Sequence, residues 1–412
     1  MSTERFSPVT TMLIAMTALF IHTSDGIAQS VMQWRGIARD GIYHETNLLK
    51  SWPETGPGQI LKIDSIGNGF ASPIVTNDRI YVPGEIDSTG YLFAFDKRGS
   101  LVWKTGTGRE WTENFPGPRS TPTLVDNLIY YCSSMGEIIC LDAANGTKKW
   151  SVNMLTDLHG INVRFGYTES LLIDNDRLFC FPGGRDTNVA ALNRYTGQLI
   201  WKGKAMGDSA AYCSPMMIPL PGKKLLVTMM IHHLIGVDAS TGELLWSHPF
   251  DRPNDIHCNT PVFDSGFIYY DDRGGNGIVK LELAPDGGSI KEVWRNFKGG
   301  NVQGGSVKLG GYLYGSRYRP GRFETISAAT GIAADSLKFS CGSTIFADNM
   351  LYCYNDQGMM GLIKPDQGKV ELVSSFKITE GTLEHFAHPV IQNGVLYIRH
   401  GKALMAYDIR RK

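Results

Sequence analysis

Hydrophobic and polar positions along this chain recur in a fixed order. A short apolar run after Ser/Thr-Pro is followed by an Asn/Asp turn and a second, more aromatic run, as in "SPIVTNDRIYV" at Ser72–Val82. A third apolar run then leads through Asp and a Gly-containing turn to a tryptophan, as in "ICLDAANGTKKW" at Ile139–Trp150. Short apolar runs separated by Asn, Asp, Gly and Pro predict β-strands joined by tight turns.

The whole unit recurs along the chain with a nearly constant period. The residues that open the copies are Ser72, Thr121, Ser170, Ser214, Thr260, Ser306, Thr344 and His388, in steps of 49, 49, 44, 46, 46, 38 and 44 residues. A period in the forties with several strands per unit is typical of a β-propeller. The sequence therefore predicts an all-β fold, an eight-bladed propeller of four-stranded antiparallel blades. Seven blades are the alternative if the degenerate sixth or seventh copy is misassigned.

The last copy lacks a fourth strand, and the chain offers one elsewhere. The segment "GQILKID" at Gly58–Asp64 has the fourth-strand pattern, with Leu61-Lys62 in place of Trp-Lys. Because an open sheet edge invites unwanted pairing, we expect this N-terminal strand to complete the last blade. The expected organisation is a signal peptide (1–28), an N-terminal segment (29–57) and a single propeller domain (58–412).

Five tryptophans occupy the same place in successive copies. They are Trp103, Trp150, Trp201, Trp246 and Trp294. A ligand-stacking cage would not require so regular a spacing, whereas rings that pack between neighbouring sheets would. We therefore predict a structural role for all five.

The N-terminus has the features of an export signal. Arg5 precedes an apolar run, Met12–Ile21, and the small residue Ala28 suits cleavage directly after it. The run is too short to span a bilayer. No cysteine precedes Cys132, so a lipid anchor at the cleavage site is not expected. We expect a periplasmic or secreted protein with no transmembrane segment in the mature chain.

Charge and cysteine content narrow the class of protein. The 40 Lys and Arg residues balance 40 Asp and Glu residues, so nothing favours nucleic acid as a partner. Seven cysteines leave at least one unpaired. Cys180 and Cys353 stand at apolar strand positions and are expected to be buried thiols. Cys132 and Cys140 flank a turn and are a candidate disulfide. No cysteine or histidine spacing predicts a metal site.

The repeat resembles that of a known superfamily. The segments "LNRYTGQLIW" (Leu192–Trp201) and "GVDASTGELLW" (Gly236–Trp246) are similar to the repeat of pyrroloquinoline-quinone-type propellers. The resemblance covers about Gly58–Lys412, and the segment Gln33–Gly58 looks like the leader of exported bacterial members. The superfamily includes quinoprotein dehydrogenases, which hold quinone and calcium in the channel, and a non-enzymatic outer-membrane assembly lipoprotein. The resemblance implies the fold more specifically than the function.

This sequence departs from the dehydrogenases in that no two of its cysteines are adjacent, and no calcium ligands can be matched. It therefore favours an exported scaffold that binds a ligand or a protein partner at one mouth of the channel, without chemistry of its own. The alternative is a quinoprotein-like oxidoreductase acting on alcohols or sugars. Quinone and calcium have no supporting motif, so no cofactor is assigned.

Connections from the fourth strand of one blade to the first strand of the next should line one mouth of the channel. Several are long and contain arginines and aromatic residues, which suit anionic groups, sugars or side chains. A protein, small-molecule or glycan partner is expected there. The candidate ligand-binding residues are Arg109, Trp111, Arg119, His159, Arg164, Tyr167, Tyr212, His257, Gln303, Arg317, His385 and His388. No catalytic residue is predicted. His232 and His233 should point to opposite faces of a strand and do not predict a metal site.

Overall fold

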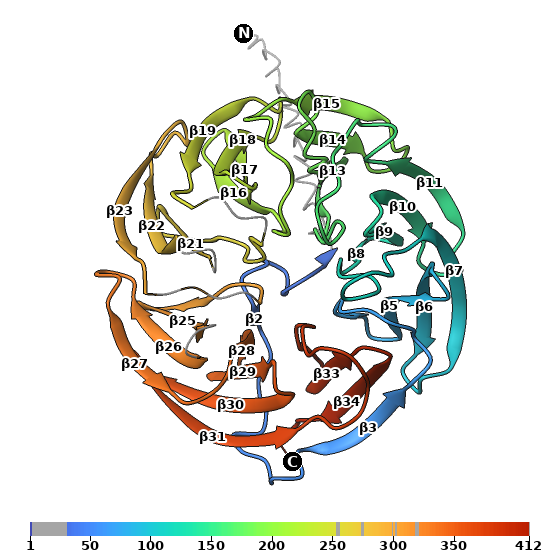
Figure 1. The fold of residues 1–412 in the computed structure, drawn as a ribbon, viewed down its shortest axis with the longest axis vertical. Helices are drawn as coiled ribbons and strands as arrows, with labels where there is room; N and C mark the ends of the chain where they lie inside the picture. Colours follow the sequence, from blue (N-terminus) through green and yellow to red (C-terminus); the bar gives the residue numbers. More distant parts are fainter. Residues whose placement is uncertain are drawn as a thin grey trace.

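The computed structural model describes Met1 and residues 31–252, 256–272, 276–298, 300, 303–317 and 321–411. Eight sheets are arranged like the blades of a wheel around a central channel (Figure 1). The predicted all-β, eight-bladed propeller of four-stranded antiparallel blades is confirmed. The expected signal peptide lies, apart from Met1, outside the described residues. No helix in the described part of the chain is long and apolar enough to cross a membrane.

In each blade the first strand lies next to the channel and the fourth forms the outer rim. Blade 1 consists of β4 (Ile74–Val75), β5 (Arg79–Ile86), β6 (Thr89–Asp96) and β7 (Leu101–Arg109). Blade 2 consists of β8 (Thr123–Val125), β9 (Leu128–Cys132), β10 (Glu137–Asp142) and β11 (Lys148–Asn153). Blade 3 consists of β12 (Leu172–Asp174), β13 (Arg177–Cys180), β14 (Val189–Asn193) and β15 (Leu199–Gly203). Blade 4 consists of β16 (Met216–Leu220), β17 (Lys223–Met229), β18 (His233–Asp238) and β19 (Leu244–Pro249).

The second half of the wheel follows the same plan. Blade 5 consists of β20 (Val262–Asp264), β21 (Phe267–Asp272), β22 (Gly277–Leu283) and β23 (Ile290–Asn296). Blade 6 consists of β24 (Val307–Leu309), β25 (Tyr312–Arg317), β26 (Arg322–Ser327) and β27 (Ala333–Leu337). Blade 7 consists of β28 (Gly342–Ala347), β29 (Met350–Asn355), β30 (Met359–Asp366) and β31 (Lys369–Lys377). Blade 8 consists of β32 (Val390–Gln392), β33 (Val395–His400), β34 (Ala403–Asp408) and β3 (Gly58–Ile63).

The ring closes where the sequence predicted it would. Strand β3 pairs antiparallel with β34, from Gly58 opposite Asp408 to Ile63 opposite Leu404. In Figure 1 the blue N-terminal strand lies beside the red C-terminal strands. The last blade thus takes its outer strand from the start of the propeller, which removes the open edge left by the truncated eighth copy.

The five tryptophans pack between neighbouring blades, as predicted. In four of them the indole N–H also donates to a backbone carbonyl of the next blade: Trp103 to Ala143, Trp150 to Arg194, Trp201 to Ala239 and Trp294 to Ala328. A glycine in the receiving turn makes room for the ring, since a Cβ at Gly146 would lie 2.6 Å from Trp103.

The exception is Trp246, whose buried Nε1 has no hydrogen-bond partner. The turn of blade 5 that follows it in space reads "LAPDGGS" instead of the common pattern, and its Gly287 faces Leu220 rather than the indole. Packing between blades is therefore general, whereas the hydrogen bond depends on the sequence of the receiving turn.

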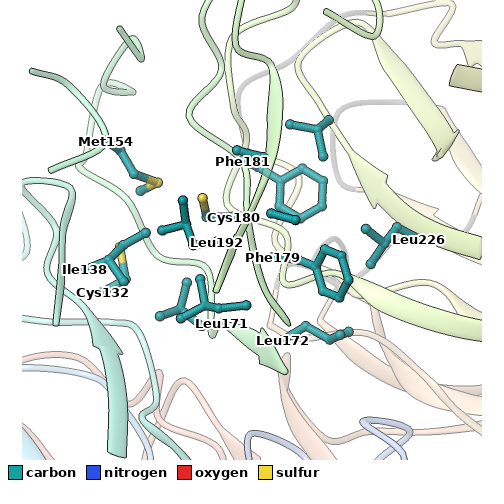
Figure 2. Close-up of a cluster of buried hydrophobic side chains, with 14 of the residues drawn as sticks. Cys132, Ile138, Met154, Leu171, Leu172, Phe179, Cys180, Phe181, Leu192 and Leu226 are labelled. Atoms are coloured by element: carbon teal, nitrogen blue, oxygen red, sulfur yellow. The ribbon is translucent and has the colours of Figure 1, made fainter. Parts of the chain in front are cut away.

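The cysteines are buried or half-buried free thiols. Figure 2 shows Cys132 and Cys180 among apolar side chains of the cluster that joins blades 2 to 4. Burial of Cys180 and Cys353 agrees with the prediction. The candidate disulfide is wrong, because Cys132 stands opposite Ile138 and Cys140 opposite Tyr130 in the ladder. The register places the two sulfurs at different levels of the hairpin.

Candidate functional site

The residues that open the repeats form a hydrogen-bonded belt around the channel. The backbone N–H of Ser72 donates to the hydroxyl of Thr121 at 3.1 Å, and that of Thr121 donates to Ser170 at 3.0 Å. Ser170 N–H donates to the Ser214 hydroxyl, and the Thr260 hydroxyl donates to the Ser214 carbonyl. A small hydroxyl residue therefore opens most copies because it links one inner strand to the next, a role that the sequence pattern alone did not reveal.

The N-terminal segment enters this channel and fills one end of it; we call residues 31–43 the plug. Strand β1 (Val31–Met32) pairs antiparallel with β8 of blade 2, and β2 (Ile42–Tyr43) pairs in parallel with β28 of blade 7. Figure 1 shows the segment crossing the centre of the wheel. Val31 stands opposite Val125, at the end of β8 that lies furthest from the belt. The plug thus enters from one face and turns back within the channel.

Two buried arginines hold the tip of the plug. Arg39 donates to the carbonyls of Ser170, Leu171 and Pro215 in blades 3 and 4. Arg35 donates to the carbonyls of Gly304 and Ser306 on the opposite side of the channel. Burial lowers the pKa of Arg39 to about 9 and that of Arg35 to about 10, so both remain charged at neutral pH. Two side chains of one short segment therefore tie together inner strands from both sides of the wheel.

The other end of the channel opens into a cavity of about 620 Å³. Its floor includes the belt residues Ser72 and Thr121, together with Trp34 of the plug and His388. Its walls come from the connections between fourth and first strands. The connections between fourth and first strands thus surround a cavity at one mouth of the channel, and that a ligand binds there stays a prediction.

One wall is a continuous aromatic arc, formed by Phe70, Phe115, Phe165, Tyr212 and Phe386. Ring centroids lie 5.4 Å apart for Phe70 and Phe386, 5.7 Å for Phe115 and Phe386, 5.8 Å for Phe115 and Phe165, and 6.0 Å for Phe165 and Tyr212. These rings come from connections that are far apart in the sequence. Only the closure of the wheel brings them together.

The loop that carries Phe115 is held rigidly. Phe115 has a φ of 61°, a left-handed conformation that costs a bulky residue on the order of 1–2 kcal/mol. Arg119 donates to the carbonyls of Asn114, Phe115 and Phe165. Glu110 accepts hydrogen bonds from the N–H groups of Trp111 and Ser134 and from the Tyr131 hydroxyl. Burial raises the pKa of Glu110. A preorganised loop with a strained backbone therefore presents the Phe115 ring.

Five of the predicted site residues line the cavity: Arg119, Arg164, Tyr212, Gln303 and His388. The guanidinium of Arg119 donates hydrogen bonds to backbone carbonyls, so Arg119 positions the loop. Arg164 is exposed and stacks on Phe165 at 4.8 Å. A binding role for each of the five remains a prediction.

The other seven, Arg109, Trp111, His159, Tyr167, His257, Arg317 and His385, do not line the cavity. Tyr167 is buried and donates to the Pro182 carbonyl, and His257 is buried against Phe250 at 4.4 Å. His385 stacks on His400 at 3.8 Å. These contacts are internal to blades and loops, so the structure brings only part of the predicted set together.

The phenylalanines of the arc were missed, although the sequence contained a signal. Phe70, Tyr212 and Phe386 each stand two residues before the residue that opens a repeat, as do the cavity residues Arg119 and Cys258. That position faces the mouth because it directly precedes the inner strand. Aligning the repeats at this position would have identified much of the wall.

No group of three or more metal-binding side chains occurs among the described residues. Asp208 accepts contacts from His232 at 3.2 Å and His233 at 2.7 Å, so both imidazoles share one carboxylate.

Comparisons with known proteins agree with this architecture. A family model described as "Outer membrane protein assembly factor BamB" matches residues 88–334, more than half of the chain. The chain is 23% identical over 292 residues to outer membrane protein assembly factor BamB of Yersinia pestis, covering 67% of each protein. It is 29% identical over 150 residues to a quinoprotein ethanol dehydrogenase of Pseudomonas aeruginosa, covering 32% of the chain and only 23% of the dehydrogenase.

Solved structures show the same fold in both kinds of relative. The crystal structure of BamB from Moraxella catarrhalis matches with a TM-score of 0.59 at 14% identity, covering 86% of this chain and 98% of that one. The quinohemoprotein alcohol dehydrogenase of Comamonas testosteroni matches with a TM-score of 0.63 at 12% identity, covering 92% and 81%. At such identities the likeness extends to the fold alone.

Proposed function

The chain belongs to the family described as "Outer membrane protein assembly factor BamB", and from this premise we propose that it is an exported propeller scaffold without chemistry of its own. It binds a polypeptide segment of a partner protein at the mouth of the cavity. The BamB of Yersinia pestis, which aligns in sequence with 67% of the chain, is named for a role in protein assembly, whereas the ethanol dehydrogenase of Pseudomonas aeruginosa aligns with 32%.

The observation that carries this proposal is the contrast between the two ends of the channel. The plug occupies one end, and the other end presents the aromatic arc on a rigid loop. Clusters of partly exposed aromatic rings in a preformed hollow are typical of the centres of protein–protein interfaces. Preorganisation reduces the entropy that binding must overcome.

The alternative, a quinoprotein-like oxidoreductase acting on alcohols or sugars, requires a site for quinone and calcium. Calcium takes six to eight oxygen ligands, commonly from several carboxylates. Asp356 is the single carboxylate among the described residues that line the cavity. Glu110 is buried and accepts hydrogen bonds from its own loop and from blade 2, and Nη1 and Nη2 of Arg119 donate to backbone carbonyls. The residues present do not fit this pair of cofactors, and no catalytic step is assigned to them.

Site-specific photocrosslinking in the native cell envelope tests the proposal. A photoreactive phenylalanine analogue replaces Phe386 in the arc, and a control carries it at Lys50, an exposed residue beside Asp348 at the plugged end. We expect one discrete crosslinked protein from position 386 and none from position 50. A crosslink confined to position 50 would contradict the proposal. Reduction of a dye by purified protein supplied with quinone, calcium and an alcohol would establish the alternative instead.

A further inference from the structure

The floor of the cavity contains a buried side chain whose hydrogen-bonding capacity is unused. His388 is 6% exposed and lines the cavity. Its ring meets Trp34 edge-on at 5.0 Å between centroids, and its Nε2 lies so close to Gly304 that a Cβ there would be 1.9 Å away. The buried Nδ1 has no hydrogen-bond partner. Native proteins rarely leave such a group unpaired without a functional reason.

The imidazole of His388 is neutral. Burial lowers the pKa of His388 well below its usual range, and the positive charge of Arg35 lowers it further. Arg35 itself is fixed beneath the floor by the carbonyls of Gly304 and Ser306. A neutral imidazole has one N–H donor and one acceptor nitrogen. The floor therefore offers a neutral imidazole contact, next to the hydroxyl residues Ser72 and Thr121 and below the aromatic arc.

Resting on the proposed function, we propose that this cavity is a receptor for a tyrosine side chain in the partner's polypeptide segment. The phenol hydroxyl hydrogen-bonds to His388, and the ring packs against the aromatic arc.

The chemistry of the floor selects this side chain. A hydroxyl both donates and accepts, so it pairs with either tautomer of His388. A cationic side chain is disfavoured next to His388 because Arg35 lies beneath it, and Nη1 and Nη2 of Arg119 already donate to backbone carbonyls and not to a ligand carboxylate. A phenylalanine would fill the ring site but leave the buried imidazole unpaired.

The size of the cavity indicates a polypeptide and not an isolated phenol. At about 620 Å³ it has room for a tyrosine ring together with flanking backbone. The wall above the floor carries Arg164, stacked on Phe165 at 4.8 Å, and the partly buried Thr168. Contacts to these residues are available only to a ligand that extends beyond the ring.

Isothermal titration of the purified protein with acetylated pentapeptides tests the inference through the ligand. The peptides have the form Gly-Gly-X-Gly-Gly, with X as tyrosine, phenylalanine or O-methyltyrosine, and p-cresol serves as the free phenol. We expect the tyrosine peptide to bind about tenfold more tightly than the phenylalanine peptide, in keeping with one hydrogen bond to a buried group. Equal affinity of these two peptides would overturn the inference. Binding of p-cresol as tightly as the tyrosine peptide would overturn its polypeptide part.

A matched pair of variants tests it through the protein. His388→Phe keeps a ring on the floor but removes both nitrogens, so the preference for tyrosine over phenylalanine should fall to about onefold while both peptides still bind. His44→Phe, an exposed position at the plugged end, should leave the preference intact. A preference that survives in His388→Phe would contradict the assignment.

If His388→Phe fails to fold, the ring ¹⁵N signals of His388 in the wild-type protein provide the same distinction. The tyrosine peptide should shift them and the phenylalanine peptide should not; identical responses would refute the contact. A specific crosslink at position 386 without any tyrosine preference would overturn this inference alone. Loss of that crosslink would overturn the proposed function itself.

Discussion

The two ends of the central channel are built from the same eight inner strands, yet they differ in chemistry. At the plugged end, Arg35 and Arg39 satisfy backbone carbonyls from both sides of the wheel, and short strands extend blades 2 and 7. At the open end, the backbone of Phe115 is strained and the buried Nδ1 of His388 has no hydrogen-bond partner. The contrast indicates that one end contributes stability and the other is prepared for a ligand, since strain and unpaired groups gather where function requires them.

The plug behaves as an intramolecular ligand of the propeller. It is tethered through residues 44–57 to β3, the strand that closes blade 8, so its effective concentration at the channel is high. A partner could enter that end only by displacing it. This supports the proposal that the partner binds at the cavity mouth.

Among substitutions that test this contrast, Arg39→Ala should reduce the stability of the protein most. It removes the donor to the carbonyls of Ser170 and Pro215 and one of the two donors to that of Leu171, which keeps the Thr123 hydroxyl. We expect a loss of about 3 kcal/mol in the free energy of unfolding, measured by urea denaturation. Arg98→Ala, which removes an exposed side chain paired only with Asp96, should change it by about 0.5 kcal/mol or less. Comparable losses in the two variants would show that Arg39 does not hold the plug in the channel.

The next effect concerns Glu169, a buried carboxyl near Arg39 of the plug. Burial raises the pKa of Glu169 to about 8, although Arg39 opposes the shift. Because the folded-state pKa lies above the unfolded value of about 4.3, the stabilising contribution is complete at low pH and disappears as the pH rises towards 8. The slope can approach about 1.4 kcal/mol per pH unit. Urea denaturation of Glu169→Gln between pH 5 and 8 should give a flatter profile than the wild type, and an unchanged slope would contradict the shift.

A smaller effect is expected where the two ends meet. Gly304 has a φ of 85° and lies between the Arg35 clamp and the His388 ring. Gly304→Ala should cost about 2 kcal/mol, through overpacking and an unfavourable φ, and should displace the imidazole. Calorimetric unfolding measures the first consequence and peptide titration the second. Full retention of both stability and tyrosine preference would show that His388 can make room for a methyl group at position 304 without losing its contact.

The smallest expected difference lies in the frame that supports both ends. Trp103→Phe removes an indole bond to Ala143, whereas Trp246→Phe removes an N–H that has no partner. Both indoles are buried to a similar degree, so the loss of ring volume is matched. Trp103→Phe should be the more destabilising by about 1 kcal/mol in urea denaturation. A larger loss of stability in Trp246→Phe would show that the bond from Trp103 to Ala143 does not account for the difference.

The fold was predictable because each blade repeats the same local chemistry. The Asp-to-Gly turn, the tryptophan and the missing fourth strand of the last copy are all visible in one sequence, and each has a local physical cause. The plug was not predictable. Residues 31–43 carry no repeat, and the acceptors of Arg39 are backbone carbonyls from two blades that converge only in the folded wheel.

The candidate site was only partly predictable for the same reason. The sequence placed Arg119 at the mouth but could not show that carbonyls of its own loop and of the loop after blade 2 would occupy its guanidinium. The predicted disulfide between Cys132 and Cys140 failed because register, not proximity along the chain, decides which residues face each other. A residue type that often binds ligands, such as arginine, can instead bind backbone carbonyls that the fold places within its reach.

Hydrogen–deuterium exchange of the free protein tests most directly whether the plug is a fixed part of the channel. We expect the hydrogen-bonded amides of the plug (31–43) to exchange as slowly as those of the inner strands β8 and β28, to which it is paired. Rapid exchange throughout 31–43, with slow exchange in β8 and β28, would contradict the claim that the plug is a fixed part of the channel.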